Sequence, residues 1–279
     1  MFVFLPALIF ESAFNSDWHI FKVEGGQVLI MAGPMLIIGT GLSALMMRFI
    51  LGYNDEKGFP WSAALLYGSI ISATDPVAVV ALLKELGASK RLATMIEGES
   101  LLNDGTAMVV FLVLLDIVEG NEATFWGVVF KFVRLSIGGP LLGLIVGIIV
   151  EQILARIHNQ FVLEVNTTIY ASYLMFFLAE STSLHVSGIL ALVAFGLYMT
   201  NSGKTKISPE SEHAVHHVWG FIGFVAETLI FVLSGIIMGE RASADDNLIG
   251  YQDYIKLLFA YIILHFIRFF CILLFYPFL

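Results

Sequence analysis

Runs of about twenty apolar residues follow one another along nearly the whole chain, and they limit the fold more than any other feature. A helix needs about 20 such residues to cross the hydrocarbon core of a bilayer. Of the 279 residues, 58% are hydrophobic and 13% are charged, about half the charged share of a soluble domain. A soluble core cannot absorb this much apolar surface, so the chain is predicted to cross a membrane several times.

The runs predict an all-α, polytopic membrane protein with nine transmembrane segments. Their expected ranges are 1–14, 26–50, 61–83, 93–118, 125–155, 161–179, 185–200, 213–239 and 253–279. The connections are short, which predicts one transmembrane domain over residues 1–279 in a lipid bilayer. The net charge of −9 gives no basic footprint, so nucleic acid is not an expected partner.

The basic residues of the connections predict an orientation. Loops on the cytoplasmic side of a membrane protein carry an excess of Lys and Arg. If alternate loops lie on the same side of the membrane, the loops of one side contain only two basic residues, Lys57 and Arg241. The predicted cytoplasmic side has Lys22, Lys84, Lys90, Arg91, Arg156, Lys204 and Lys206. We therefore expect the loops 84–92 and 201–212 to face the cytoplasm.

The sequence Thr74-Asp75-Pro76 interrupts the segment 61–83. Proline removes a backbone donor and disfavours helical geometry in the preceding residue, which predicts a discontinuous helix here. At membrane depth, freed backbone groups are tolerated only inside protein or beside a cavity, and transporters build ion sites from such breaks. The Thr74 hydroxyl and the Asp75 carboxylate are hard oxygen ligands for a small cation. The alternative is a proline kink with a capping aspartate.

A second polar cluster lies in the next segment. On a helix, residues four apart share a face, so Ser100 lies above Asp104, and Glu99 lies above Asn103 on the adjacent face. A charge at the bilayer centre costs at least about 2.5–3.5 kcal/mol, and such residues mark ion and proton pathways. We expect burial to favour the protonated form of Asp104, as a proton-coupled carrier requires. The alternative is a hydrogen-bond network that joins helices.

Arg268 lies well inside the last segment, where a buried guanidinium needs a partner. We expect an ion pair with Glu99; the alternative is an Arg268 side chain that reaches the membrane interface. Glu227 could line an ion funnel or bond a backbone group of a neighbouring helix. No resident metal site is expected, because a solvated helix entry explains the histidines better than a zinc site does. These are His213, His216 and His217.

Three stretches resemble the sodium/proton exchanger family of cation/proton antiporters. They are ATDPVAV at 73–79, GESLLND at 98–104 and LHVSGILA at 184–191. The run from 73 looks most similar to the plasma-membrane branch that includes the plant salt-tolerance and sperm-type exchangers. The resemblance implies an ion-transport domain and a dimerisation domain, an elevator-like alternating access, a homodimer and a location in the plasma membrane.

The resemblance also implies roles for individual residues. Asp104 would bind either a proton or sodium, with lithium or potassium as other cations, and no cofactor would be needed. Its neighbour Asn103 is associated with electroneutral exchange. The supporting residues would be Asp75, Thr74 and Ser100, beside an ion pair of Glu99 with Arg268.

The family usually has a dozen or more helices in an inverted repeat. We therefore expect residues 1–279 to be a partial exchanger domain without the first two helices, the last two helices and the cytoplasmic tail. A non-transporting scaffold or sensor remains an alternative. An intramembrane aspartyl protease built on Asp75 and Asp104 is a weaker one, because no Gly-Xaa-Gly-Asp stretch occurs. A channel is a weaker alternative still. Because transport requires no covalent chemistry, we expect no enzymatic activity.

Overall fold

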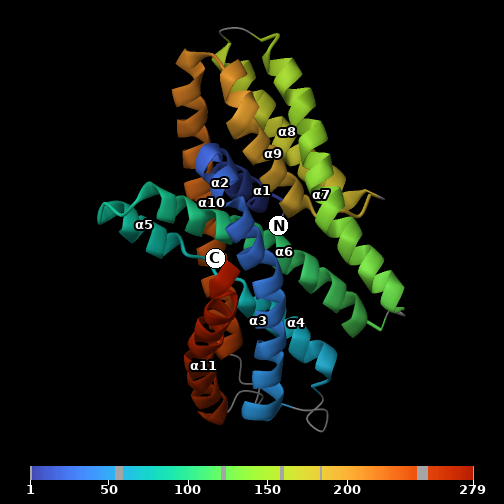
Figure 1. Ribbon diagram of the computed structural model, residues 1–279. Helices are drawn as coiled ribbons and strands as arrows, with labels where there is room; N and C mark the ends of the chain where they lie inside the picture. Colours follow the sequence, from blue (N-terminus) through green and yellow to red (C-terminus); the bar gives the residue numbers. More distant parts are fainter. Residues whose placement is uncertain are drawn as a thin grey trace.

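Over the residues that the computed structural model describes, which are 2–53, 59–120, 124–157, 160–182, 184–243 and 251–278, every regular secondary-structure element is a helix. Figure 1 shows how the helices are arranged. In chain order they are α1 (Leu5–Asn15), α2 (Trp18–Ile30), α3 (Leu36–Leu45), α4 (Trp61–Ser72), α5 (Val77–Glu85), α6 (Lys90–Val118), α7 (Phe125–Leu154), α8 (Phe161–Ser181), α9 (Gly188–Tyr198), α10 (Pro209–Ser243) and α11 (Tyr251–Phe275).

Six of the nine predicted segments are long and apolar enough to cross a membrane, judged over the described residues. They are Trp18–Ile50, Lys90–Val118, Phe125–Leu154, Phe161–Ser181, Ser211–Arg241 and Tyr254–Phe275. The other three predicted segments contain shorter helices: α1, the pair α4 and α5, and α9. An apolar run of this length also suits a helix buried inside the protein, which is why the sequence pattern did not separate the two cases.

The first long span is one continuous helix that changes its winding twice. It consists of α2 and α3, joined by a π-helical turn at Met31–Met35 and followed by another at Met46–Ile50. Pro34 lies inside the first of these turns. Proline has no N–H and its ring crowds the carbonyl one turn back, so the helix must widen or bend there. We call Met31–Met35 the π segment.

The main core surrounds α9, which is buried along its whole length apart from the half-buried Ala194 and Tyr198. This helix packs against α1, α6, α7 and α8. Phe10 of α1 contacts both Phe195 of α9 and Trp219 of α10, with ring centroids 5.1 and 4.5 Å apart. The indole N–H of Trp219 donates a hydrogen bond to Thr168 Oγ1 of α8 at 3.0 Å. Burial of these rings explains why so short a helix as α1 is held in place.

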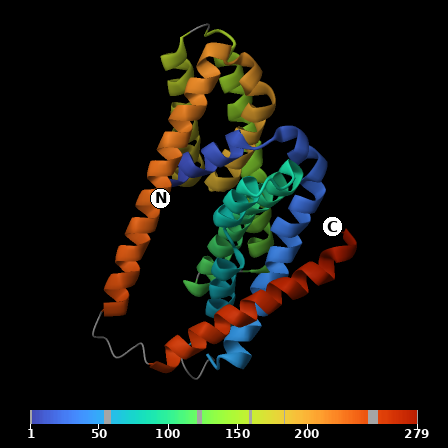
Figure 2. The ribbon, with the colours of Figure 1, turned by 90° about the vertical axis from the view of Figure 1, so that its left-hand side faces the viewer.

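A smaller assembly contains α3, α4 and α11. In Figure 1 it lies in the lower part of the molecule, whereas α8 and α9 lie in the upper part. Figure 2 shows α11 running obliquely past α3, which it contacts. A Cβ at Gly68 of α4 would lie 2.4 Å from the carbonyl oxygen of Thr40. The close packing of α4 on α3 therefore requires glycine at this position.

Glycine also sets the packing of α7 on α9. A Cβ at Gly143 would lie 2.1 Å from the carbonyl oxygen of Ala191, and one at Gly139 would lie 2.6 Å from that of Ser187. Both obstacles are backbone atoms, which cannot move as a side-chain end can. The two helices must therefore separate if either glycine gains a side chain.

Gly143→Ala is expected to destabilise the protein by about 1–3 kcal/mol, because the added methyl group forces α7 away from α9. The measurement is the midpoint of thermal unfolding in detergent. Gly127→Ala on the same helix is the control, since no atom of the described residues lies within 4 Å of the added Cβ. Equal midpoints for the two variants would contradict the packing argument.

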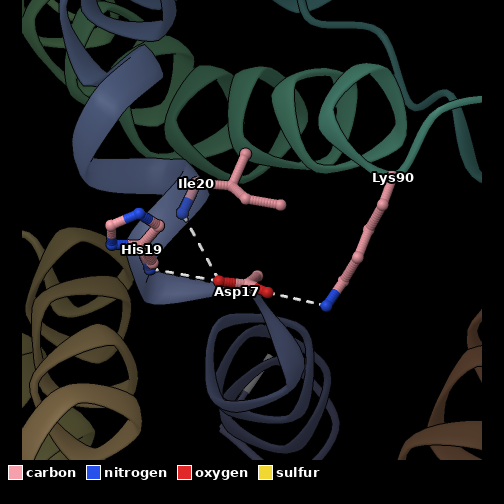
Figure 3. Close-up of polar contacts among 4 residues, drawn as sticks. All are labelled: Asp17, His19, Ile20 and Lys90. Atoms are coloured by element: carbon pink, nitrogen blue, oxygen red, sulfur yellow. Dashed lines mark hydrogen bonds and ion pairs between the residues drawn. The ribbon is translucent and has the colours of Figure 1, made fainter.

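Asp17 begins α2 and ties it to the start of α6 (Figure 3). Its Oδ1 atom accepts hydrogen bonds from the backbone N–H groups of His19 and Ile20, at 3.1 and 3.4 Å. Its Oδ2 atom accepts a hydrogen bond from Lys90 Nζ at 2.7 Å. The hydrogen bond from Lys90 holds the pKa of the Asp17 carboxyl below its usual value. Asp17 therefore stabilises the fold as a carboxylate.

Asp17→Ala is expected to cost about 1 kcal/mol near neutral pH, the usual value of a helix cap. Because the pKa of Asp17 is lower in the folded state, this contribution is present above the unfolded pKa and is lost as the pH falls. Thermal unfolding across the acidic range measures it. Asp17→Asn keeps the cap acceptor and should retain most of the stability. A difference between Asp17→Ala and the parent that is the same at every pH would contradict this role.

Two of the loops predicted to be cytoplasmic lie together. Lys90 and Lys204 line one cavity of about 640 Å³, together with Asp17 and Glu97. The loops 84–92 and 201–212 thus meet on one side of the molecule. Lys57, which belongs to a loop predicted to face away from the cytoplasm, lies outside the described residues.

Candidate functional site

The helix that the sequence predicts to be discontinuous is broken at the predicted place. α4 ends at Ser72, residues 73–76 are not helical, and α5 begins at Val77. Ala73 is extended, with ψ 128°. The carbonyl oxygen of Pro76 then accepts a hydrogen bond from the N–H of Val80 at 2.8 Å, which starts the next helix. The break therefore places Thr74 and Asp75 between two helix ends.

The polar residues of α6 differ in their access to the outside of the chain. Asn103 is buried, with 2% of its surface exposed, whereas Glu99 and Ser100 are half-buried. Asp104 is exposed, contrary to the simple expectation that its apolar segment would bury it. It still lies among enough protein atoms to lose part of its hydration. Asp104 is thus a partly desolvated carboxyl group at the surface of the described part of the chain.

The break and the polar face of α6 come together because α4 and α5 both pack against α6. The Asp75 and Asp104 carboxylates are near enough to interact electrostatically. Two neighbouring carboxylates repel each other when both are charged, and a bound proton or cation relieves the repulsion. Residues 29 positions apart in the sequence therefore form one acidic centre.

Arg268 of α11 lies at the same break. Its Nη2 atom is 3.7 Å from Glu99 Oε1 and donates a hydrogen bond to Thr74 Oγ1. The Glu99 side chain is 12% exposed, so a nearby positive charge offsets the cost of burying its carboxylate. The guanidinium thus joins α11, α6 and the break between α4 and α5.

A cavity of about 520 Å³ opens beside this ion pair. Its walls come from the π segment, α3, the end of α4, α6 and α11. Of the predicted site residues, it is lined by Thr74, Glu99, Asn103 and Arg268. Asp75, Asp104 and Ser100 are not on its wall. The structure therefore divides the predicted residues between this cavity and the acidic centre formed by Asp75 and Asp104.

Two serines on the cavity wall were not identified from the sequence. Ser43 and Ser72 each have a buried hydroxyl oxygen without a hydrogen-bond partner among the described residues. Their signal in the sequence is the four-residue spacing of Gly39 with Ser43 and of Gly68 with Ser72. Small residues at this spacing are typical of closely packed membrane helices.

The remaining predicted residues lie elsewhere. Glu227 is half-buried on α10 and lines neither of the two cavities described above, so its funnel role stays a prediction. His216 Nδ1 lies 2.6 Å from Asn15 Oδ1, and Asn15 donates to Glu11 Oε1 at 2.6 Å. This chain of contacts joins α10 to α1. Over the described part of the chain, no three His, Cys, Asp or Glu side chains gather as a metal site would require.

Comparison with known proteins gives consistent matches along the chain. A family model described as "Sodium/hydrogen exchanger, transmembrane" matches residues 1–279. Sodium/hydrogen exchanger 7 of Arabidopsis thaliana is 39% identical over 265 residues, which are 93% of this chain and 22% of that protein. The low-affinity Na(+)/H(+) antiporter NhaS1 of Synechocystis is 36% identical over 247 residues, 88% of this chain and 45% of that protein.

A solved structure has a similar fold. The sodium proton antiporter MjNhaP1 from Methanocaldococcus jannaschii matches with a TM-score of 0.68 and 19% identity, over 82% of this chain and 54% of that one. The chain thus spans about half of this structure and less than half of the two relatives named above. The family match over all residues, the helical architecture and the broken helix agree, and the chain belongs to the sodium/hydrogen exchanger family.

Proposed function

We propose that this chain carries the ion-binding part of an antiporter that exchanges sodium for protons. The observation that carries the proposal is the acidic centre, where Asp75 from a broken helix meets Asp104 from α6. The names of the relatives, which state sodium and proton exchange, support this choice of ions. Exchange of ions by an integral membrane protein needs no covalent chemistry, so we propose neither an enzymatic step nor a cofactor.

In the proposed cycle, Asp104 binds either one proton or one cation. The like charge of Asp75 makes the empty, doubly charged state unfavourable, so release of one ion favours binding of the other. Asn103 and Ser100 would supply neutral oxygen atoms on the same helix. Thr74 Oγ1 accepts a hydrogen bond from Arg268 and has a second lone pair left for a cation. Exchange of one sodium for one proton would be electroneutral.

The ion pair of Glu99 and Arg268 has a supporting role in this proposal. It would hold the positive charge of Arg268 beside the Glu99 carboxylate, so that Glu99 is neutralised and only the acidic centre exchanges ions. Alternating access, a homodimer and a location in the plasma membrane complete the proposal. Lithium and potassium are the other monovalent cations that the same site could exchange.

The test is the thermal stability of the purified protein in detergent, titrated with sodium or potassium at an acidic and an alkaline pH. A ligand at about 100 times its Kd stabilises the folded state by about 2.7 kcal/mol. Sodium should raise the unfolding midpoint more at the alkaline pH, where fewer protons compete, and Asp104→Asn should remove the effect.

Three outcomes separate the proposal from its rivals. A response to sodium that survives in Asp104→Asn would move the site elsewhere. No response to any cation at either pH would favour the non-transporting scaffold. Cleavage of a membrane peptide that depends on both Asp75 and Asp104 would favour the protease.

A further inference from the structure

Thr106 of α6 joins the helix of the acidic centre to the π segment. Its hydroxyl lies 2.6 Å from the carbonyl oxygen of Ala32, and 3.0 and 3.1 Å from the carbonyl oxygens of Leu102 and Asn103. A threonine hydroxyl has one proton to donate, and the shortest of the three contacts is the one between helices. Thr106 therefore bonds outside its own helix.

The acceptor lies where the first long helix is irregular. Ala32 belongs to the π segment, which also contains Pro34. In membranes, Ser and Thr hydroxyls that bond groups of a neighbouring helix help to hold the two helices together. π-helical turns inside α-helices are frequent at functional sites. The contact between Thr106 and Ala32 thus fixes an otherwise adaptable stretch of backbone.

α6 is held from a second direction at the preceding residue. A Cβ at Gly105 would lie 2.4 Å from Leu190 Cδ2 of α9, so α6 approaches α9 as closely as a glycine permits. Gly105 and Thr106 directly follow Asp104. The stretch of α6 that carries Asn103 and Asp104 is therefore fixed between α9 on one side and the π segment on another.

The same contact spaces two walls of the cavity beside the ion pair. Met31 and Met35, which begin and end the π segment, line that cavity together with Asn103. Thr106 lies three residues after Asn103, on the same face of α6. A shift of the π segment away from Thr106 would move the methionines relative to Asn103.

We propose that Thr106 is a positioning residue for ion exchange, whose hydrogen bond to Ala32 holds Asn103 and Asp104 in the geometry that binds sodium. The inference rests on the exchange function proposed above. It assigns Thr106 no contact with the ion, so its effect should fall on apparent sodium affinity and depend on the hydroxyl group.

The experiment measures sodium-dependent proton movement in liposomes that contain the purified protein. Thr106→Val keeps the volume and removes the hydroxyl; its KM for sodium should rise about threefold to twentyfold, the range measured for hydrogen bonds between membrane helices. Thr106→Ser keeps the hydroxyl and should remain close to the parent. Thr167→Val is the matched control, because the Thr167 hydroxyl bonds Leu163 O within its own helix.

An unchanged KM in Thr106→Val would overturn the inference, as would a Thr106→Ser variant that is impaired equally. A lower maximal rate and unfolding midpoint at constant KM would also overturn it, since they indicate a structural role alone. If the parent moves no protons in response to sodium, the proposed function fails instead. In that case, amide hydrogen exchange tests whether the hydrogen bond from Thr106 to Ala32 holds the π segment. Thr106→Val must accelerate amide exchange in Met31–Met35, and unchanged rates there reject the inference.

Discussion

Asp104→Asn is expected to abolish sodium-dependent proton movement in liposomes that contain the protein. The amide has the size of the carboxylate, but it neither binds a proton nor carries a charge. A unit charge about 4 Å from a cation contributes about 4 kcal/mol at an effective dielectric constant of 20, which is roughly a thousandfold in affinity. Asp104→Glu keeps the carboxyl group and should retain part of the activity.

A matched control for this prediction lies on the same helix. Asp116 is 39% exposed and forms an ion pair with Lys131 of α7, away from the broken helix. Asp116→Asn makes the same chemical change and should leave exchange close to that of the parent. Normal sodium-dependent exchange by Asp104→Asn, or its loss in both variants, would contradict the assignment of Asp104.

Arg268→Met is expected to cause the largest loss of stability among the variants discussed here. It leaves the carboxylate of Glu99 without its positive partner and removes the donor to Thr74 Oγ1. Removing one member of a buried ion pair costs on the order of 3 kcal/mol, because the remaining charge stays out of water. The midpoint of thermal unfolding in detergent measures the loss.

The double variant Arg268→Met with Glu99→Gln should recover part of that stability, since no unpaired charge remains. Lys131→Met provides the contrast: its partner Asp116 is far more exposed than Glu99, and such pairs contribute about 1 kcal/mol or less. If the double variant is no more stable than Arg268→Met, the ion pair is not what Arg268 contributes.

Much of the fold and part of the site could be predicted because a few residues leave the chain little choice. Pro76 disfavours helical geometry in Asp75 before it, and the break lies at 73–76, whereas Pro34 only widens a helix that continues past it. The four-residue spacing in 99–104 determines which polar side chains share a face of α6. Arg268 inside the last segment requires a buried partner, and the structure places Glu99 beside it.

The rest depends on contacts that an apolar run does not encode. The length of a run did not reveal that α9 is a short buried helix, since spanning and buried helices are equally apolar. Asp104 is exposed although it lies in an apolar segment, and its exposure depends on how the neighbouring helices pack against α6, not on the sequence of its own segment. Ser43 and Ser72 had only the small-residue spacing with Gly39 and Gly68 as a signal, and Thr106 had none, because single hydroxyl residues are common in membrane helices.

The packing of α1 against α9 also has a consequence for the order of events during synthesis. Thr200 Oγ1, just past α9, lies 3.3 Å from the carbonyl oxygen of Ala13 in α1, across 187 positions of sequence. Chains grow at about 5–20 residues per second, so α1 exists for roughly 10–40 s before its partner has been made. During that interval Phe10 of α1 lacks the ring of Phe195 against which it packs in the folded protein.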